Sequence, residues 1–333
     1  MRRSLSTVTA GKALLFLIVL LTLAACGPTE PQQGELREIR LPMGFIPNVQ
    51  YAPFYVADER GYFEDEGISI QFDYSSETDG VALVGSGELD FSLASGEQVL
   101  LAREQGAPVV YVFAWWQDFP VAVTAMEQQG LQSPEDLAGM EVGIPGRFGA
   151  SYIGFISLLR AGGLSEDDVQ LDSIGFNQVE ALAAGQDDAV VVYANNEPIQ
   201  LRAQGYEIDV LRVSEYVDLA SNGVITNEQT IEENPELVEG MIRAVFQGVR
   251  DTIEDPEAAF RISMEYVEGL EEADRATQMQ VLETSIEFWK AERLGFSEPE
   301  AWQNMQEVLL AMGLLADPIE LEHAYTNQFL PSP

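Results

Sequence analysis

The chain has 333 residues, 46% of them hydrophobic, and its 55 acidic residues outnumber 17 basic ones, which gives a formal net charge of −38. This length exceeds the usual size of a single core and favours two domains, while the hydrophobic content is ordinary for a soluble globular protein. The strongly negative charge, without any basic patch in the sequence, argues against nucleic-acid binding.

The first 25 residues differ from the rest of the chain and predict a signal peptide. Three basic residues precede an apolar run over residues 13–23. This run is shorter than the ~20 residues that a membrane-spanning helix needs, so it is typical of a signal peptide. We therefore assign residues 1–25 to an export signal.

The segment Leu23-Ala24-Ala25-Cys26 fits the cleavage pattern of a lipoprotein, and Cys26 is the only cysteine in the chain. Two acyl chains on this residue would anchor the protein stably. Residues 26–36 are rich in Pro and Gln and predict a flexible tether. We expect an exported protein that is lipid-anchored through Cys26 to the outer face of the cell membrane.

After the tether, residues 39–72 predict a strand, a turn, a helix and a second strand. Residues 39–45 form a short apolar run, the turn Ile46-Pro47-Asn48 ends it, and residues 52–60 have helical spacing. Gly61 stands where a helix-ending glycine belongs, and residues 68–72 alternate as a strand. The polar turn at residues 48–51 lies at the carboxyl end of a strand, where ligands bind in open α/β sheets.

Strands and helices keep alternating along the chain, which predicts an α/β protein with mostly parallel sheets. Two β-rich segments, at residues 120–125 and 220–226, have the character of crossovers between two lobes. We assign residues 37–122 and 222–333 to lobe 1 and residues 123–221 to lobe 2. From residue 228 onward the pattern is wholly helical.

The amino-acid sequence of the opening unit also points to a particular protein family. It resembles the start of ABC-transporter substrate-binding proteins of the branch that handles riboflavin and the pyrimidine precursor of thiamine. The matching segments are Phe45-Ile46-Pro47-Asn48, Tyr55-Val56-Ala57, Gly61-Tyr62-Phe63 and Glu66-Gly67-Ile68. Two α/β lobes with two crossovers and a C-terminal helical tail describe a type II periplasmic-binding-protein fold, whose cleft closes on ligand by a hinge motion.

The candidate ligand-binding residues follow strand ends. Further residues at these strand ends, which we do not assign to the site, are 75–78, Gln98, 147–150, Phe176, Asn177 and Asn196. The residues that we assign to the site are Asn48, Tyr51, Ser95, Glu97, Trp115, Trp116, Asp118, Ser151, Tyr152, Tyr193, Asn195 and Glu197.

This set is rich in aromatic and uncharged hydrogen-bonding groups, which suits a planar heteroaromatic ring, whereas a sulfonate or phosphate would call for several Arg donors. Adjacent residues of an extended strand point in opposite directions, so we expect at most one of Trp115 and Trp116 to face the cleft. Glu197 either caps its helix or accepts from a ligand donor. The resemblance supports the same places: residues 48 and 51, the Gly146 loop, and residues 195–198.

Catalysis has little support in the sequence. The only histidine, His323, lies in the helical tail, and clusters of His or Cys that would hold zinc or iron are missing. The related pyrimidine synthases have a cysteine-rich segment and a histidine at the position of Tyr51. We therefore expect a protein that is not an enzyme and has neither a metal nor a cofactor.

The sequence thus predicts the solute-binding component of an ABC importer, with riboflavin as the transported ligand and ABC permease subunits as partners of a monomer. The alternatives are a binding protein for a hydroxymethylpyrimidine-type thiamine precursor and a pyrimidine-synthase-like enzyme.

Overall fold

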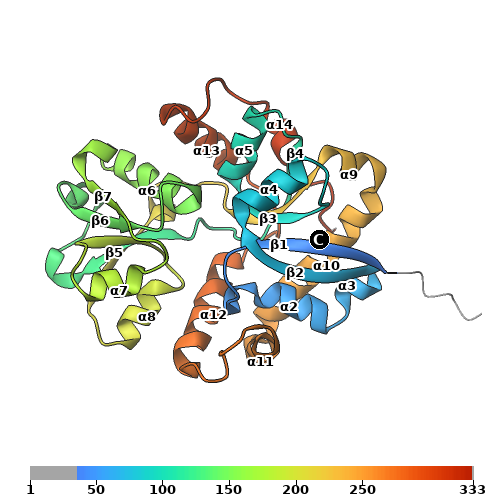
Figure 1. Cartoon of the computed structure of the whole chain (residues 1–333), viewed down its shortest axis with the longest axis horizontal. Coiled ribbons are helices and arrows are strands. Elements are labelled where there is room, and N and C mark those ends of the chain that lie inside the picture. Colours follow the sequence, from blue (N-terminus) through green and yellow to red (C-terminus); the bar gives the residue numbers. More distant parts are fainter. Residues whose placement is uncertain (1–35, 332–333) are drawn as a thin grey trace, which may run out of the picture. The chain divides into compact units, whose positions relative to one another are not determined.

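The computed structural model describes residues 36–331 (Figure 1). The predicted signal peptide, Cys26 and the tether up to residue 35 lie outside the described residues. Within residues 36–331, no helix combines the length and the apolar composition that crossing a membrane requires.

The opening unit forms as predicted. Strands β1 (Arg37–Gly44) and β2 (Ile68–Ser76) pair in parallel, with Leu41 opposite Phe72. They are connected by η1 (Val49–Tyr51), α2 (Ala52–Glu59) and α3 (Tyr62–Asp65). Gly61 follows α2 with a φ of 74°, the left-handed conformation that favours glycine at a helix end.

A second sheet lies next to this unit and has the strand order β3-β10-β4. We call the elements of these two sheets, together with the helical tail, lobe 1. The strands and helices that complete the sheets are β3 (Ser92–Ser95), β4 (Val109–Ala114), β10 (Asn222–Asn227), α4 (Glu77–Gly85) and α5 (Gly96–Glu104).

The chain after β10 is helical up to residue 331, as predicted, apart from two single β-bridges, Tyr111 to Tyr325 and Ala114 to Gly295. Its helices are α9 (Glu228–Glu233), α10 (Pro235–Glu254), α11 (Pro256–Tyr266), α12 (Arg275–Trp289), α13 (Pro299–Ala311) and α14 (Leu321–Ala324). Several begin with proline, whose fixed φ suits the first turn of a helix.

Lobe 2 is built on a five-stranded sheet with the order β7-β6-β8-β5-β9. Its helices α6, α7 and α8 alternate with the strands along the chain. The elements are β5 (Val121–Met126), η2 (Glu127–Gln129), η3 (Pro134–Leu137), β6 (Glu141–Ile144), α6 (Gly149–Ala161), η4 (Glu166–Asp168), β7 (Gln170–Ser173), α7 (Gln178–Ala183), β8 (Ala189–Tyr193), α8 (Glu197–Ala203), β9 (Ile208–Arg212) and η5 (Val213–Glu215).

The expectation of mostly parallel sheets is wrong. β10 runs antiparallel to β3 and β4, and β5 runs antiparallel to β8 and β9. These are the two strands that follow the connections between the lobes, so each enters its sheet in the reverse direction. The predicted boundaries after residues 122 and 221 fall near the starts of β5 and β10, and the division into two domains stays a prediction.

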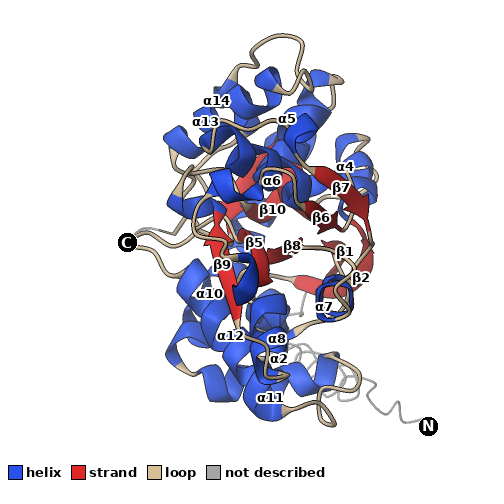
Figure 2. Cartoon of the chain, turned by 90° about the vertical axis from the view of Figure 1, so that its left-hand side faces the viewer, coloured by secondary structure: helices blue, strands red, loops and turns tan. Residues whose placement is uncertain are grey.

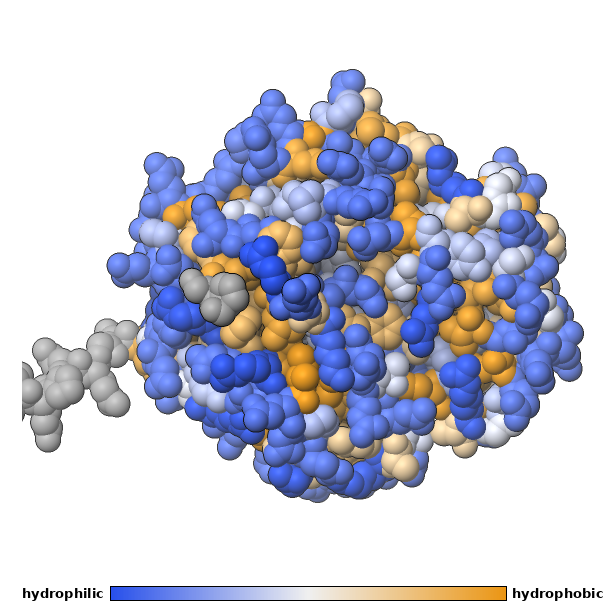
Figure 3. Space-filling view, turned by 180° about the vertical axis from the view of Figure 1, so that it is seen from behind, coloured by the Kyte–Doolittle hydropathy of each residue, from blue (hydrophilic) through white to orange (hydrophobic). Residues whose placement is uncertain are grey.

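Large aromatic side chains fill the interior of the described unit. Trp289, Trp302, Tyr55 and Phe54 are among the largest fully buried residues. Figure 2 shows helices flanking the strands on two sides. On the face drawn in Figure 3, hydrophilic residues cover most of the surface, as the acidic composition predicts.

Candidate functional site

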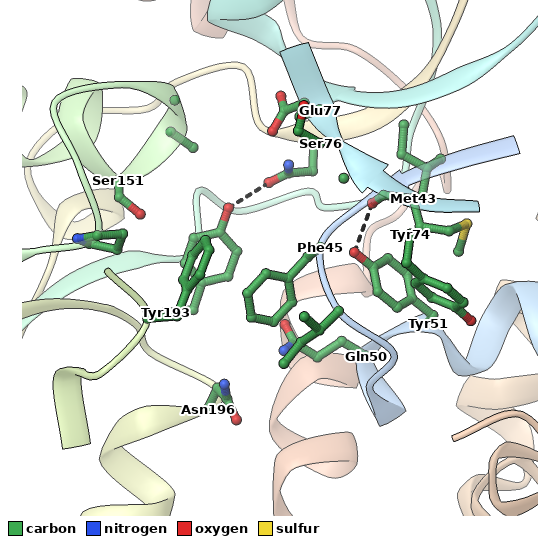
Figure 4. A pocket seen from close by; sticks show the side chains of 18 of the residues that line it. Met43, Phe45, Gln50, Tyr51, Tyr74, Ser76, Glu77, Ser151, Tyr193 and Asn196 are labelled. Atoms are coloured by element: carbon green, nitrogen blue, oxygen red, sulfur yellow. Dashed lines mark hydrogen bonds between the residues drawn. The ribbon is translucent and has the colours of Figure 1, made fainter. Parts of the chain in front are cut away.

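A cavity of about 390 Å³ lies between lobe 1 and lobe 2 and takes side chains from both. Its wall includes the turn after β1, the ends of β2, β4 and β8, and the start of α6 (Figure 4). This volume falls within the range of roughly 300–1,000 Å³ that small-molecule sites occupy.

Lobe 1 contributes an aromatic wall that the fold holds rigidly. Tyr51 stacks on Trp115 with ring centroids 5.4 Å apart, and its hydroxyl donates to the Met43 carbonyl oxygen at 2.8 Å. Trp115 and Trp116 are buried and pack against Trp289. The rings of Tyr51, Trp115 and Trp116 all belong to the buried core of the described residues, so packing behind them sets the ring faces that they present to the cavity.

Both tryptophans line the cavity, so the expectation that at most one would face it is wrong. Strand β4 ends at Ala114, one residue before the pair. The alternation of a β-strand therefore no longer applies to Trp115 and Trp116, and their rings meet edge to face at 5.5 Å.

Lobe 2 contributes aromatic side chains that are open rather than packed. Phe148 and Phe176 line the cavity yet remain 63% and 62% exposed. Phe176 reaches across to Phe45 of lobe 1, with ring centroids 5.0 Å apart. Open apolar rings beside a cavity offer surface that a planar ligand can cover.

Tyr193 links the two lobes at the cavity. Its hydroxyl donates to Asn222 Oδ1 at 3.1 Å, and its ring lies edge to face with Trp116 at 6.1 Å. Asn222 is the first residue of β10, so the hydrogen bond joins the end of a lobe 2 strand to the strand that returns to lobe 1.

Two glutamates share one serine at the lobe 1 side of the cavity. Ser95 N donates to Glu77 Oε1 at 2.5 Å, and the Ser95 hydroxyl contacts both this oxygen and, at 2.5 Å, Glu97 Oε1. A hydroxyl has a single hydrogen, so hydrogen bonds to two carboxyl groups require one of the carboxyls to carry a proton.

The electrostatics of this pair agree with the geometry. Burial raises the pKa of Glu77, and burial together with the charge of Glu77 raises the pKa of Glu97 to about 8. The pair therefore holds a shared proton at neutral pH, and Glu77 is the member that lines the cavity.

Glu197 also lines the cavity, but its loop already engages both carboxylate oxygens. Oε2 accepts from the Tyr193 backbone N–H and Oε1 from Asn196 Nδ2, each at 2.9 Å. Burial raises the pKa of this carboxyl. Both donors precede α8, so these hydrogen bonds fix the Glu197 carboxyl within the loop and do not cap the helix.

No lysine, arginine or histidine is among the described residues that line the cavity. Arg147, the cation of the glycine-rich loop, instead pairs with Glu166, which also accepts from the Tyr152 hydroxyl at 2.6 Å. An anionic group would meet Glu77 and Glu197 without a compensating charge, so the arrangement suits an uncharged ligand.

The predicted site residues divide into two groups. Those on the cavity wall are Tyr51, Trp115, Trp116, Ser151, Tyr193 and Glu197. The others, which do not line it, are Asn48, Ser95, Glu97, Asp118, Tyr152 and Asn195. Asn48 caps η1 by accepting from the Gln50 N–H at 3.0 Å, and Asn195 donates to Ser285 Oγ at 2.8 Å. Ser95 and Glu97 are buried and connect to the cavity through Glu77.

Several lining residues escaped the rule that ligands meet strand ends. Asn222 begins a strand, Tyr74 lies inside β2, and Gln178 lies in a helix. Phe45 belongs to the apolar run that opens the unit, and its sequence position gave no sign of a place on the cavity wall. Only pairing of the two lobes brings these residues together.

Comparisons with known proteins agree with this architecture. The chain is 39% identical to the riboflavin-binding protein RibY of Chloroflexus aurantiacus, over 95% of this chain and 97% of the relative. It is 28% identical to the formylaminopyrimidine-binding protein of Halalkalibacterium halodurans, over 95% and 98% of the two chains.

Solved structures show the fold. The alkanesulfonate-binding protein SsuA of Xanthomonas axonopodis pv. citri superposes with a TM-score of 0.70 at 16% identity, covering 88% of this chain and 99% of that one. A Candida albicans protein described as having the generic periplasmic binding protein fold gives a TM-score of 0.64 at 17% identity, covering 90% and 99%. These likenesses confirm the predicted periplasmic-binding-protein fold.

The sequence profile of the NMT1/THI5-like family matches residues 48–259, a stretch that begins at the predicted Pro-Asn turn and spans both lobes. The resemblance inferred from the opening unit is thus confirmed over most of the chain, and this protein belongs to the NMT1/THI5-like family.

Proposed function

We propose that this chain is the solute-binding component of an ABC importer and that it captures riboflavin in the cavity between its lobes. The observation that carries this proposal is the character of the cavity wall, which combines aromatic side chains from both lobes with two glutamates and no cation among the described residues. A relative that is 39% identical over nearly the whole chain is a riboflavin-binding protein.

The isoalloxazine ring of riboflavin is planar, uncharged and three rings wide. Such a ring can lie against the fixed wall of Tyr51 and Trp115 while the open Phe148 and Phe176 approach from lobe 2. Its polar edge carries both N–H donors and carbonyl acceptors. Glu77 and Asn196 offer groups of matching kind on the cavity wall.

A pyrimidine precursor of thiamine is the second candidate, because a 28% identical relative binds formylaminopyrimidine. A single pyrimidine ring would cover fewer of the aromatic faces that line the cavity. Measuring the affinity of the protein for each of the two ligands therefore separates these candidates.

We propose that the chain is not an enzyme, although a relative from Legionella pneumophila at 23% identity is a hydroxymethylpyrimidine phosphate synthase. The family resemblance places Tyr51 where the synthases have histidine, and the Tyr51 hydroxyl donates to the Met43 carbonyl oxygen. His323 lies on α14, is paired with Glu320 and does not line the cavity. These features support binding without chemistry and without a cofactor.

The proposal places the protein outside the cell, lipid-anchored through Cys26, as a monomer that delivers its ligand to ABC permease subunits. Closure would occur at residues 117–120 and 213–221, in the two segments that connect β4 to β5 and β9 to β10. Hinge closure around a ligand is the common mechanism of binding proteins with this fold.

The test is a set of calorimetric titrations of the purified protein with riboflavin, its 5′-phosphate and formylaminopyrimidine. We expect tight binding of riboflavin and at least ~10-fold weaker binding of the phosphate, because a phosphate monoester carries about −1.5 to −2 charges and would meet carboxylates rather than arginines. If the protein bound formylaminopyrimidine tightly and did not bind riboflavin, the pyrimidine would take the place of riboflavin as the assigned ligand. Binding of none of the three compounds would overturn the proposed function.

A further inference from the structure

Lobe 2 carries a second cluster of carboxylates, made of residues that are not part of the cavity wall. Glu141, Asp172 and Asp187 each offer one oxygen, and these three oxygens lie within 4.8 Å of one another. None of the three residues lines the cavity between the lobes. The cluster therefore needs an explanation other than ligand capture.

The topology of the sheet brings these side chains together. Glu141 begins β6, Asp172 lies on the neighbouring β7 directly opposite Gly143, and Asp187 immediately precedes the segment that enters β8 on the other side of β6. Glu141 and Gly143 are two residues apart and so share one face of β6. All three carboxylates thus converge over the same part of the sheet.

Gly143 makes room for the central carboxylate. A Cβ placed on this residue would lie 2.8 Å from Asp187 Oδ2 and 2.7 Å from Ile174 Cδ1. Any larger residue at position 143 would therefore displace the Asp187 carboxylate from its place above the strand.

Asp187 has no partner that would explain its burial. The residue is 4% exposed, and neither of its carboxylate oxygens has a hydrogen-bond partner among the described residues. A buried carboxylate is normally paired, hydrogen-bonded or bound to a metal ion, since removing it from water is costly. Here it faces an aliphatic side chain and two further acids.

The surroundings add negative charge rather than compensate it. No ion pair within residues 36–331 involves Glu141, Asp172 or Asp187, and Gln186 Nε2 donates to Asp172 Oδ2 at 3.5 Å. Asp188 lies beside the cluster and accepts from the Glu141 N–H at 3.0 Å. Burial, followed by the charges of Asp172, Glu141 and Asp188, raises the pKa of Asp187 to about 6.

We propose that Glu141, Asp172 and Asp187 form a binding site for a hard divalent cation, Ca²⁺. The donors are all carboxylate oxygens, which Ca²⁺ prefers, and the cluster contains neither histidine nor cysteine, the ligands typical of zinc sites. Oxygens within 4.8 Å of one another can share an ion whose metal–oxygen distances are about 2.4 Å.

The ion would tie together three neighbouring segments of lobe 2, namely the start of β6, the middle of β7 and the approach to β8. Its role is therefore structural: it satisfies the buried Asp187 and cross-links the edge half of the five-stranded sheet. Ligand capture between the lobes does not depend on it, so this inference stands apart from the proposed function.

The experiment compares the wild-type protein with Asp187→Asn and with Asp167→Asn, a control that removes one exposed acid of lobe 2 outside the cluster. Each protein is treated with EDTA, dialysed into a buffer of about 0.15 M salt to screen diffuse ion binding, and titrated with CaCl₂ by calorimetry and by thermal melting. Riboflavin titrations run in parallel as an independent readout.

We expect one Ca²⁺ per chain and a melting temperature that rises with Ca²⁺ in the wild type and in Asp167→Asn. Asp187→Asn should lose at least ~10-fold in Ca²⁺ affinity while still folding, because the amide keeps the shape and removes the charge. Absence of saturable Ca²⁺ binding to the wild type would overturn the proposal and leave a proton as the occupant of Asp187. Ca²⁺ binding by Asp187→Asn with the affinity of the wild type would also overturn the proposal, because the Ca²⁺ would then be bound by other acidic groups of the surface.

Discussion

Replacing Phe176 tests whether the open aromatic side of the cavity binds the ligand. The side chain is 62% exposed although it lines the cavity, so it contributes little to the core. If ~150–200 Å² is taken for a phenylalanine, about 100 Å² of apolar surface stays open for a ligand to cover. At about 25 cal/mol per Å², complete coverage is worth about 2.5 kcal/mol.

We therefore expect Phe176→Ala to weaken riboflavin binding by about 10- to 70-fold, the upper figure corresponding to complete coverage, since each ~1.4 kcal/mol is a factor of ten. The free energy of unfolding should change by less than about 1 kcal/mol, because an exposed ring with one edge contact to Phe45 is lost. The riboflavin affinity of Phe176→Leu should lie between those of the wild type and Phe176→Ala, because leucine keeps an apolar side chain but lacks the aromatic ring.

The assay is calorimetry with riboflavin, accompanied by thermal melting of each variant. Leu314→Ala is the control, because Leu314 is an exposed large apolar residue that neither lines the cavity nor lies in a segment that connects the lobes. If Phe176→Ala bound riboflavin as tightly as the wild type and Leu314→Ala, the open rings would have no part in binding and the reasoning from exposure would be refuted.

Three further predictions concern the lobe contact, the shared proton and the anchor. Tyr193→Phe removes the hydrogen bond to Asn222 at 3.1 Å, which is worth about 0.5–1.5 kcal/mol. Calorimetry should therefore show riboflavin binding weakened by about 2- to 10-fold. An unchanged affinity would exclude a role for this hydrogen bond in binding. The pKa of Glu97 is raised from its ordinary 4.5 to about 8, so the folded state binds the proton more tightly than the unfolded state, and stability falls as the pH rises from about 4.5 to about 8. The melting temperature should therefore fall less steeply with pH in Glu97→Gln than in the wild type. Parallel curves for the two proteins would contradict the shared proton. Cys26→Ser should move the processed protein from the membrane fraction to the soluble fraction, whereas mass spectrometry that finds an unmodified Cys26 in the wild type would contradict the anchor.

Local patterns in the sequence predict the opening unit well because its signals are local. A short apolar strand, the Pro-Asn turn and a glycine at the helix end specify β1, α2 and their connection within 25 residues. The direction of β5 and β10 is different in kind, since it depends on how the chain passes between lobes. No periodicity within either strand distinguishes an antiparallel partner from a parallel one.

The same distinction explains the predicted site. Residues at or after strand ends, such as Tyr51, Trp115 and Tyr193, line the cavity because β1, β4 and β8, which belong to three different sheets, all end toward it. Ser95 ends β3 and Glu97 follows it, yet both turn into the protein, where Ser95 bonds to Glu77 and its hydroxyl contacts Glu97. Strand position thus predicts which segments approach the cavity, while hydrogen bonding decides which side chains face it.

The charge of the cavity separates function from fold in this protein. The chain superposes on an alkanesulfonate-binding protein with a TM-score of 0.70 at 16% identity, a likeness that shows a shared fold and does not extend to the ligand. The lining residues, however, contain carboxylates at Glu77 and Glu197, while Arg147 is held at the surface by Glu166. An anion in this cavity would therefore lack a charged donor and face two acids, whereas a neutral aromatic ring would be covered by tyrosine, tryptophan and phenylalanine from both lobes. The side chains that the two lobes present, rather than the fold that positions them, are the reason to assign an uncharged heterocycle to this member of the NMT1/THI5-like family.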